Sequence, residues 1–382
     1  MLKIKSKNQD SFEFPLIGYA GYAITKLFSS VRPLSYLLDR LETMVLHNAL
    51  NKIFIDRPIY ITGLARAGTS IILEILSKHP DLAAHQYKHL LMPYIPHWIN
   101  HIAQFTKFYS EPVERLHADG IYITRNSPEA VEEKFWQTFF ENCHNENTSN
   151  IISKDISNPK FELFYQNHIK KLIISQNASR YLAKNNYNIT RLEYLLRIFP
   201  DSKFLVIIRN PVNHIASLIK QTQLYMRMEK DVSLLIDWLK IVGHHEFGHR
   251  QVCINVGNTE LIHKIRKLWR DKKAYVKGWA YYWNSIYEFI ANSLDENKEL
   301  KKATYVVNYD KLCEIPDRII DNMLKHAELP INGFEQTKKY YVNHLHQPTY
   351  YTPNFTPLDL EYIYEVTKET ASRFGLSFPQ TQ

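Results

Sequence analysis

A chain of 382 residues with 45% hydrophobic and 23% charged side chains has the composition of an ordinary folded protein, which argues against a disordered or fibrous one. The formal net charge of +8 favours anionic ligands, but no long lysine/arginine run indicates a nucleic-acid partner. Cys143, Cys253 and Cys313 are far apart and form no CxxC pair, which argues against a disulfide framework or a thiolate metal site and favours a reducing compartment, the cytoplasm.

The N-terminal part of the chain is expected to be mostly helical, from about residue 16 to residue 52, and it has no signal-peptide core. Residues 15–31 (PLIGYAGYAITKLFSSV) are the most membrane-like segment. Lys26 interrupts this segment, which is shorter than the roughly 20 apolar residues that a span needs. We therefore expect a docked amphipathic helix and no transmembrane span, with a peripheral membrane contact as the alternative.

A short buried strand at 58–62 is followed by the loop GLARAGTS (63–70) and then by a helix that ends before Pro80. Glycines let backbone N–H groups approach a phosphate closely, and a helix start attracts anions. An ATP or GTP loop would read GxxxxGK[ST], whereas Gly68 precedes Thr69 here and the cation is Arg66. No convincing magnesium-binding aspartate follows a later strand, so we expect an anion held without a metal. Taken alone, the loop is also compatible with a simple turn.

The rest of the chain alternates between predicted strands and helices. Strands are predicted at 151–154, 180–184, 203–208 and 304–308. Helices are predicted at 90–147 (clearest at 129–140), 161–174 and 190–199. After the third strand, Asn210 can cap a new helix that has Pro211 at its first position. This alternation predicts a central, mainly parallel α/β sheet flanked by helices.

Ligands of such sheets bind beyond the carboxyl ends of the strands. Arg66, Lys184, Arg209 and Tyr309 each follow or end a predicted strand. We therefore expect these four side chains at one edge of the sheet.

Four segments resemble motifs of the sulfotransferase family that depends on 3'-phosphoadenosine-5'-phosphosulfate (PAPS), in the branch with tyrosylprotein sulfotransferases and many bacterial enzymes. IYITGLARAGTSIILEILSKHPDL resembles the 5'-phosphosulfate loop, and KFLVIIRNPVNHIASLIK resembles the 3'-phosphate motif. YLAKNNYNITRLEYLLRIFP is similar to the lysine strand, and VVNYDKL to the late strand with its tyrosine. The resemblance implies one P-loop-like sulfotransferase domain (1–382), with a helical extension (1–56), a PAPS-binding core (57–325) and a C-terminal helical and loop cap (326–382).

The resemblance also implies an activity: in-line transfer of a sulfuryl group from PAPS to a hydroxyl or amine, with PAP as product and no metal required. It assigns cofactor contacts to Arg66, Ala67, Gly68, Thr69 and Ser70 at the 5' end, to Arg209 and Ser217 at the 3'-phosphate, and to Tyr309 near the adenine. Lys184 matches the catalytic lysine, although most lysines at strand ends are surface residues. The acceptor (a small molecule, glycan, lipid or peptide) and the oligomeric state stay open.

The general base does not follow from the resemblance. Tyrosylprotein sulfotransferases use a glutamate after the loop helix, where this sequence reads AHQYKH (84–89) and has no carboxylate. Cytosolic sulfotransferases use a histidine two residues beyond the lysine, where Asn186 stands. His85 and His89 are candidates by position, and His245 and Glu246 by chemistry, with a structural role as the alternative for each histidine.

Residues 245–249 (HEFGH) match the HExxH zinc motif, so a zinc hydrolase is one alternative function. Gly248 within the required helix would cost about 1 kcal/mol, and the extended zinc-ligand pattern fails at Val252 and Asn255. GHHEFGHR also resembles a stretch of many bacterial sulfotransferases, so we expect it to form part of an acceptor pocket. A non-catalytic module that binds PAP or another nucleotide is the second alternative.

Overall fold

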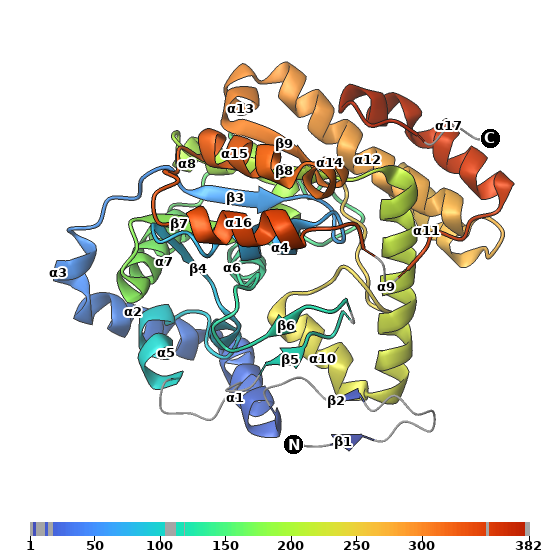
Figure 1. Ribbon diagram of the computed structural model, residues 1–382. Coiled ribbons are helices and arrows are strands. Elements are labelled where there is room, and N and C mark those ends of the chain that lie inside the picture. The colour runs from blue at the N-terminus through green and yellow to red at the C-terminus, as the bar shows by residue number, and fades with distance from the viewer. Residues whose placement is uncertain are drawn as a thin grey trace.

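The computed structural model describes residues 3–4, 12–13, 18–103, 112–117, 119–348 and 351–378. A five-stranded parallel sheet in the order β4-β7-β3-β8-β9 forms its centre (Figure 1). Its strands are β3 (Ile59–Thr62), β4 (Leu82–Ala84), β7 (Arg180–Lys184), β8 (Lys203–Ile208) and β9 (Thr304–Asn308). The parallel α/β architecture that the sequence predicts is confirmed.

Alternate residues of each strand face two different apolar clusters, because successive side chains point to opposite faces of a sheet. Ile59 and Ile61 lie in one cluster and Tyr60 in the other. The first cluster contains α4 (Thr69–Leu76), α14 (Tyr309–Glu314), α15 (Pro316–Ala327) and α16 (Glu335–His344). The second contains α6 (Glu133–Phe139), α7 (Pro159–Gln176), α8 (Leu192–Ile198), α9 (Pro211–Asp231), α10 (Ser233–Val242), α11 (Thr259–Arg270), α12 (Tyr275–Glu296), α13 (Lys298–Ala303) and α17 (Pro357–Arg373).

The remaining described elements are four helices, two 3-10 turns and two ribbons. The helices are α1 (Gly18–Ser30), α2 (Arg32–Val45), α3 (His47–Leu50) and α5 (Pro96–Ile102), and two 3-10 turns span Tyr87–Leu90 and Asn186–Thr190. Two antiparallel ribbons pair β1 (Lys3–Ile4) with β2 (Phe12–Glu13), and β5 (Val113–Glu114) with β6 (Tyr122–Ile123). No helix of the described residues is both long and apolar enough to cross a membrane.

Several predicted boundaries need correction. The helix predicted at 129–140 begins only at Glu133, because Glu129 N–H donates to the His85 carbonyl (2.9 Å) and Pro128 bridges Gln86. That pairing keeps residues 128–129 extended. The region 90–147, predicted to be mainly helical, contains the β5–β6 ribbon between α5 and α6. The strand predicted at 151–154 is wrong, since this segment forms no strand although Ile152 N–H donates to Thr190 O.

Other predicted elements are confirmed nearly to the residue. The strands at 180–184, 203–208 and 304–308 have the expected bounds. Asn210 caps α9 through its side-chain oxygen, which accepts from Val212 N–H, and Pro211 is the first helical residue. The helix predicted from 16 to 52 is present as α1, α2 and α3, with breaks at Val31 and Leu46.

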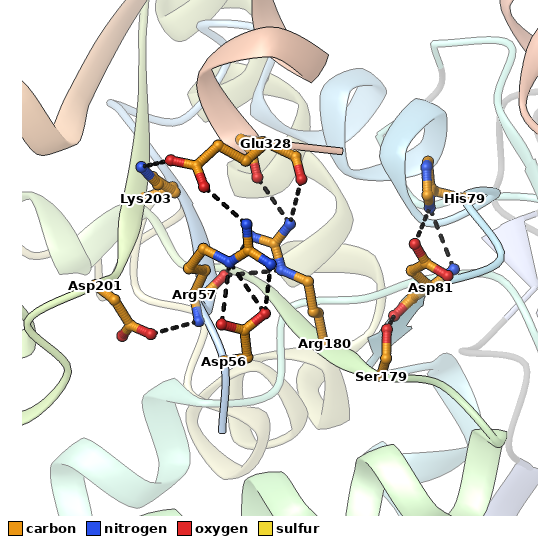
Figure 2. A network of polar contacts seen from close by, with 10 residues as sticks. Asp56, Arg57, His79, Asp81, Ser179, Arg180, Asp201, Lys203 and Glu328 are labelled. Carbon is orange, nitrogen blue, oxygen red and sulfur yellow. Dashed lines mark hydrogen bonds and ion pairs between the residues drawn. The ribbon is translucent and has the colours of Figure 1, made fainter. Parts of the chain in front are cut away.

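An ionic network joins the amino ends of β3, β7 and β8 to the end of α15 (Figure 2). Arg180 donates to the carbonyls of Arg57, Ala327 and Glu328. The Glu328 carboxylate in turn binds Arg57 (2.7 Å) and Lys203 (2.5 Å). These contacts fix one end of the sheet, and the candidate site lies at the other.

Candidate functional site

The loop between β3 and α4 lies at the carboxyl edge of the sheet and has little steric freedom. Gly68 has a φ of +106°, and a Cβ at this position would lie 2.2 Å from Cδ2 of Tyr309. Only glycine fits such a close approach in a left-handed conformation. Arg66 also has a positive φ of +69°, which is unusual for a side-chain-bearing residue and indicates a loop held in shape by its surroundings.

The Arg66 guanidinium contacts a carboxylate and a hydroxyl from distant parts of the chain. Its Nη1 lies 3.0 Å from Oδ2 of Asp119, and its Nε donates to Oγ of Ser217 at 3.4 Å. Asp119 also binds Arg115, with Nε and Nη2 at 2.8 and 2.5 Å. Burial acts to raise the pKa of Asp119, but Arg115 outweighs it and holds that pKa well below the ordinary value. Arg66 therefore forms an ion pair with the ionised carboxylate of Asp119 in this structure.

Arg209 is a buried cation at the carboxyl end of β8, with only 3% of the residue exposed. Among the described residues, its Nε has no hydrogen-bond partner, and the nearest carboxylate oxygen, on Asp310, lies 4.0 Å away. Its guanidinium lies over the rings of Tyr309 (5.0 Å) and Tyr351 (5.7 Å). A buried donor without a partner is costly, so this site favours an added anion.

One cavity of about 620 Å³ contains both arginines in its wall. Gly68, Thr69, Ser70 and Tyr309 line it as well, together with residues of α16 and the segment that follows. Arg66 and Arg209 therefore line the same cavity. Of the other expected cofactor contacts, Ala67 is fully buried beneath the loop, and Ser217 is buried on α9 against Arg66.

A second, narrower cavity of about 100 Å³ adjoins the first, and Arg66, Arg115, Thr69 and Ser70 line both. Lys184, the last residue of β7, lines the second cavity and is 8% exposed. Burial lowers the pKa of the Lys184 ammonium, and the carboxylates of Glu129 and Glu246 partly offset this effect. The apolar part of its wall is formed by Leu90, Leu116, Ile123, Tyr225, Trp238, Leu239, Val242 and Phe247.

Glu246 and His244 face this second cavity as a pair. Nδ1 of His244 lies 3.5 Å from one Glu246 oxygen, and Asn186 donates to the other at 3.0 Å. Burial acts to lower the pKa of His244, but Glu246 raises it above the ordinary value. Burial acts to raise the pKa of Glu246, but His244 and Lys184 lower this pKa to about 2. The carboxylate is therefore ionised at neutral pH and orients the imidazole.

His85 and His89, candidates by position, lie outside both cavities. His85 is buried beyond the edge strand β4, where its Nε2 lies 2.8 Å from Nε2 of His168, and burial lowers its pKa to about 3. His89 is buried beside it and contacts Asn100 (3.1 Å). Neither ring reaches the cavity that Lys184 lines.

The HExxH match has no zinc geometry in this structure. α10 ends at Val242, the segment after Gly243 is not helical, and Gly248 has a φ of +83°. His245 contacts Gln137 (2.6 Å), whereas His249 contacts Glu229 (2.6 Å). The helix on which the zinc hypothesis depends is thus absent from this described segment. His245 points away from the cavity, and burial lowers its pKa to about 4.

Within the described ranges, one group of side chains is close enough to share an ion: Glu133, Cys143 and His144. Arg191 already binds both oxygens of Glu133, at 2.7 and 2.9 Å. This arrangement is an ion pair in the core rather than a metal site.

The sequence did not single out four residues of the site: Arg115, Asp119, Glu129 and His244. The first two lie on the turn between β5 and β6, in a region predicted to be helical. His244 is adjacent to a candidate, but only the left-handed Gly243 that ends α10 decides which histidine faces the cavity. The GHHEFG pattern is the sequence feature that could have identified His244.

Together, the fold and the two adjoining cavities define an α/β protein with cationic ligand sites at the carboxyl edge of a parallel sheet. Residues 58–244 match the model of the sulfotransferase family, and the chain belongs to this family as a sulfotransferase enzyme. The family and the enzyme class that the motifs predict are thereby confirmed, whereas the tyrosylprotein branch stays a prediction.

The comparison with solved structures finds one with the same fold and a second that is less similar. A sulfotransferase from Mycobacterium avium shares 14% identity over 96% of this chain and 88% of its own, with a TM-score of 0.58. A sulfotransferase from Mycobacterium tuberculosis H37Rv shares 14% identity over 93% of this chain and 86% of its own, with a TM-score of 0.46. No curated protein matches in the sequence comparison.

Proposed function

We propose that this enzyme transfers a sulfuryl group from PAPS to a hydroxyl or amine of an acceptor, without a metal. The observation that carries the proposal is that Arg66 and Arg209 line one cavity while Lys184 lines the cavity that adjoins it. PAPS, when bound, supplies a sulfuryl group on a nucleotide phosphate and a second phosphate at the 3' position. Its two anionic ends match the two cationic ends of the larger cavity.

The residues present fit such a donor. At one end, Arg209 offers a buried fork with an unpartnered Nε, and Tyr309 provides an adjacent ring. At the other, the Gly68 turn and the start of α4 offer backbone N–H groups, and Arg66 adds a cation. Ser217 on α9 accepts a hydrogen bond from Arg66 and so holds the guanidinium beside the loop.

Lys184 is the residue placed to stabilise the leaving group. As the S–O bond breaks, negative charge grows on the bridging oxygen, and a cation held there lowers the barrier. A buried ammonium is well suited because its charge is poorly screened by water. Lys184 and Arg66 supply the positive charge that a metal ion supplies in phosphoryl transfer.

His244 is the residue that we propose as proton acceptor, with Glu246 as its positioning residue. A base must lie within reach of the acceptor hydroxyl, and both residues line the cavity that Lys184 lines. Glu246 binds Nδ1 of His244, an arrangement that leaves Nε2 to take the proton. The cytoplasmic location predicted from the cysteines is part of this proposal, and three free thiols agree with it.

Binding and turnover of wild type and a Lys184→Met variant test the proposal. Saturating PAP should raise the melting temperature of both, because a ligand at 100 times its Kd stabilises by about 2.7 kcal/mol. Only wild type should transfer radiolabelled sulfate from PAPS to a panel of phenols, alcohols and amines. Lys78→Met, at an exposed position after α4, is the matched control and should behave as wild type.

Two outcomes would contradict the proposal: a wild-type protein that PAP does not stabilise, or a Lys184→Met variant with full turnover. A protein that binds PAP tightly but transfers sulfate to no acceptor would instead favour a nucleotide-binding module.

A further inference from the structure

Large apolar side chains are exposed along the N-terminal helices. We call the following residues, each 40–79% exposed, the N-terminal apolar surface: Ile24, Leu27, Val31, Leu37, Leu41, Met44, Val45 and Phe54. On α2 they recur at helical spacing (37, 41, 44 and 45) and therefore form one stripe on the outer side of the helix. A contiguous exposed stripe of this kind indicates a surface that another phase or molecule covers.

The charges on α2 are sorted in the same way. Its two acidic residues, Asp39 and Glu42, turn inward and bind the buried Lys171 at 2.7 and 3.3 Å. Its two basic residues, Arg32 and Arg40, are exposed. The outer side of α2 is thus apolar and basic, a combination that complements a negatively charged surface with an apolar interior.

Helix α10 connects the N-terminal apolar surface to the second cavity, which Lys184 lines and which we call the acceptor cavity. Asp237 of α10 accepts from Tyr22 of α1 (2.5 Å) and pairs with Lys26 (2.8 Å). The next residues of α10, Trp238 and Leu239, line the cavity that contains Lys184. Helix α10 thus contacts α1 through Asp237 and forms part of the wall of the acceptor cavity through Trp238 and Leu239.

We propose that the N-terminal apolar surface docks on an anionic lipid bilayer and holds the enzyme at its surface. The apolar stripe enters the boundary between headgroups and acyl chains, and Arg32 and Arg40 bind the headgroup phosphates. A bilayer fits better than a second copy of the chain. In a two-fold dimer the stripe would meet itself and bring the Arg32 and Arg40 side chains of both copies to one interface, where like charges repel. If the proposed function holds, docking brings the acceptor cavity to molecules at the bilayer surface.

Vesicle sedimentation of the full chain tests the proposal without any activity measurement. Wild type should bind vesicles of phosphatidylcholine mixed with phosphatidylglycerol, and binding should fall at high salt and with phosphatidylcholine alone. The double variant Leu41→Asp/Met44→Asp should reduce partitioning at least about 10-fold. The matched control is Ile331→Asp/Leu358→Asp, two exposed apolar residues near α15 and on α17, away from α1 and α2 (Figure 1). It should bind vesicles as wild type does.

Both double variants should keep the wild-type melting temperature and PAP affinity, so a loss of vesicle binding would not reflect unfolding or a failed cofactor site. The proposal is overturned if the wild-type protein does not bind anionic vesicles or if both double variants lose vesicle binding to the same extent. It is also overturned if analytical ultracentrifugation shows a dimer that only Leu41→Asp/Met44→Asp dissociates, since a second copy would then cover the surface.

Discussion

Replacing Arg209 with alanine should remove recognition of one phosphate and leave the rest of the nucleotide site unchanged. In the structure, this guanidinium is buried, its Nε lacks a hydrogen-bond partner among the described residues, and the Asp310 carboxylate is 4.0 Å away. A 3'-phosphate would give the fork two charge-assisted hydrogen bonds that nothing else in the described chain supplies.

The expected loss can be worked out from that geometry. A hydrogen bond to a charged group contributes about 1.5–3 kcal/mol. Two such bonds contribute about 3–6 kcal/mol, and since each 1.4 kcal/mol is a factor of ten, the Kd of PAP should rise about 10²- to 10⁴-fold in Arg209→Ala. Adenosine 5'-phosphate has no 3'-phosphate, so its Kd should stay the same. Arg66→Ala should weaken both ligands, because we propose that Arg66, which lines the same cavity, contacts the 5' end of the nucleotide.

Isothermal titration calorimetry of both ligands against both variants measures this pattern directly. Arg227→Ala, an exposed arginine on α9, is the matched control and should bind both ligands as wild type does. If Arg209→Ala weakened PAP and adenosine 5'-phosphate by the same factor, or weakened neither, the assignment of Arg209 to the 3' end would be refuted.

Four further outcomes are expected. Asp119→Asn should tighten PAP about 10-fold by calorimetry, because the carboxylate on Arg66 competes with the incoming anion; weaker binding would instead make Asp119 a positioning residue. His244→Ala should lower turnover about 10²- to 10⁴-fold. Glu246→Gln should move the acidic limb of the pH–rate profile to lower pH, since Glu246 raises the His244 pKa; an unmoved limb would contradict this pairing. His85, with a pKa of about 3, is charged more readily in the unfolded chain, so its stabilisation is complete above about pH 6.5 and is lost as pH falls toward 3. Urea unfolding at pH 7 and 5 should show a loss of about 2 kcal/mol from this residue that His85→Gln abolishes, and an equal loss in the variant would refute it.

The sheet and the cofactor side of the site could be predicted because both depend on local pattern. Buried parallel strands are continuous apolar runs, and β8 (KFLVII) is one of them. A residue at the end of such a strand, or shortly after it, lies at the carboxyl edge of the sheet however the helices pack. Arg66, Lys184 and Arg209 could be identified for this reason. Their roles, by contrast, came from the family resemblance and stay proposals.

The residues that line the second cavity could not be predicted, because many of them lie on turns, and turns have no hydrophobic periodicity in the sequence. Asp119 comes from a turn between two-residue strands in a region that reads as helical. His85 follows the loop helix as the family's base does, yet it turns into the core against His168. Which histidine faces the cavity depends on how α10 ends, and that conformation is set by tertiary packing around Gly243.

The order of the strands has a consequence for how the protein matures. Among the described residues, β9 is the last strand and pairs with β8 alone, and Tyr309 directly after it packs on the Gly68 loop, more than 240 positions earlier. A nascent chain that has emerged only as far as α12 has β3, β7 and β8 but lacks one wall of the nucleotide cavity. Nucleotide affinity should therefore arise late in synthesis, and the ligand would select chains whose final strand has joined the sheet.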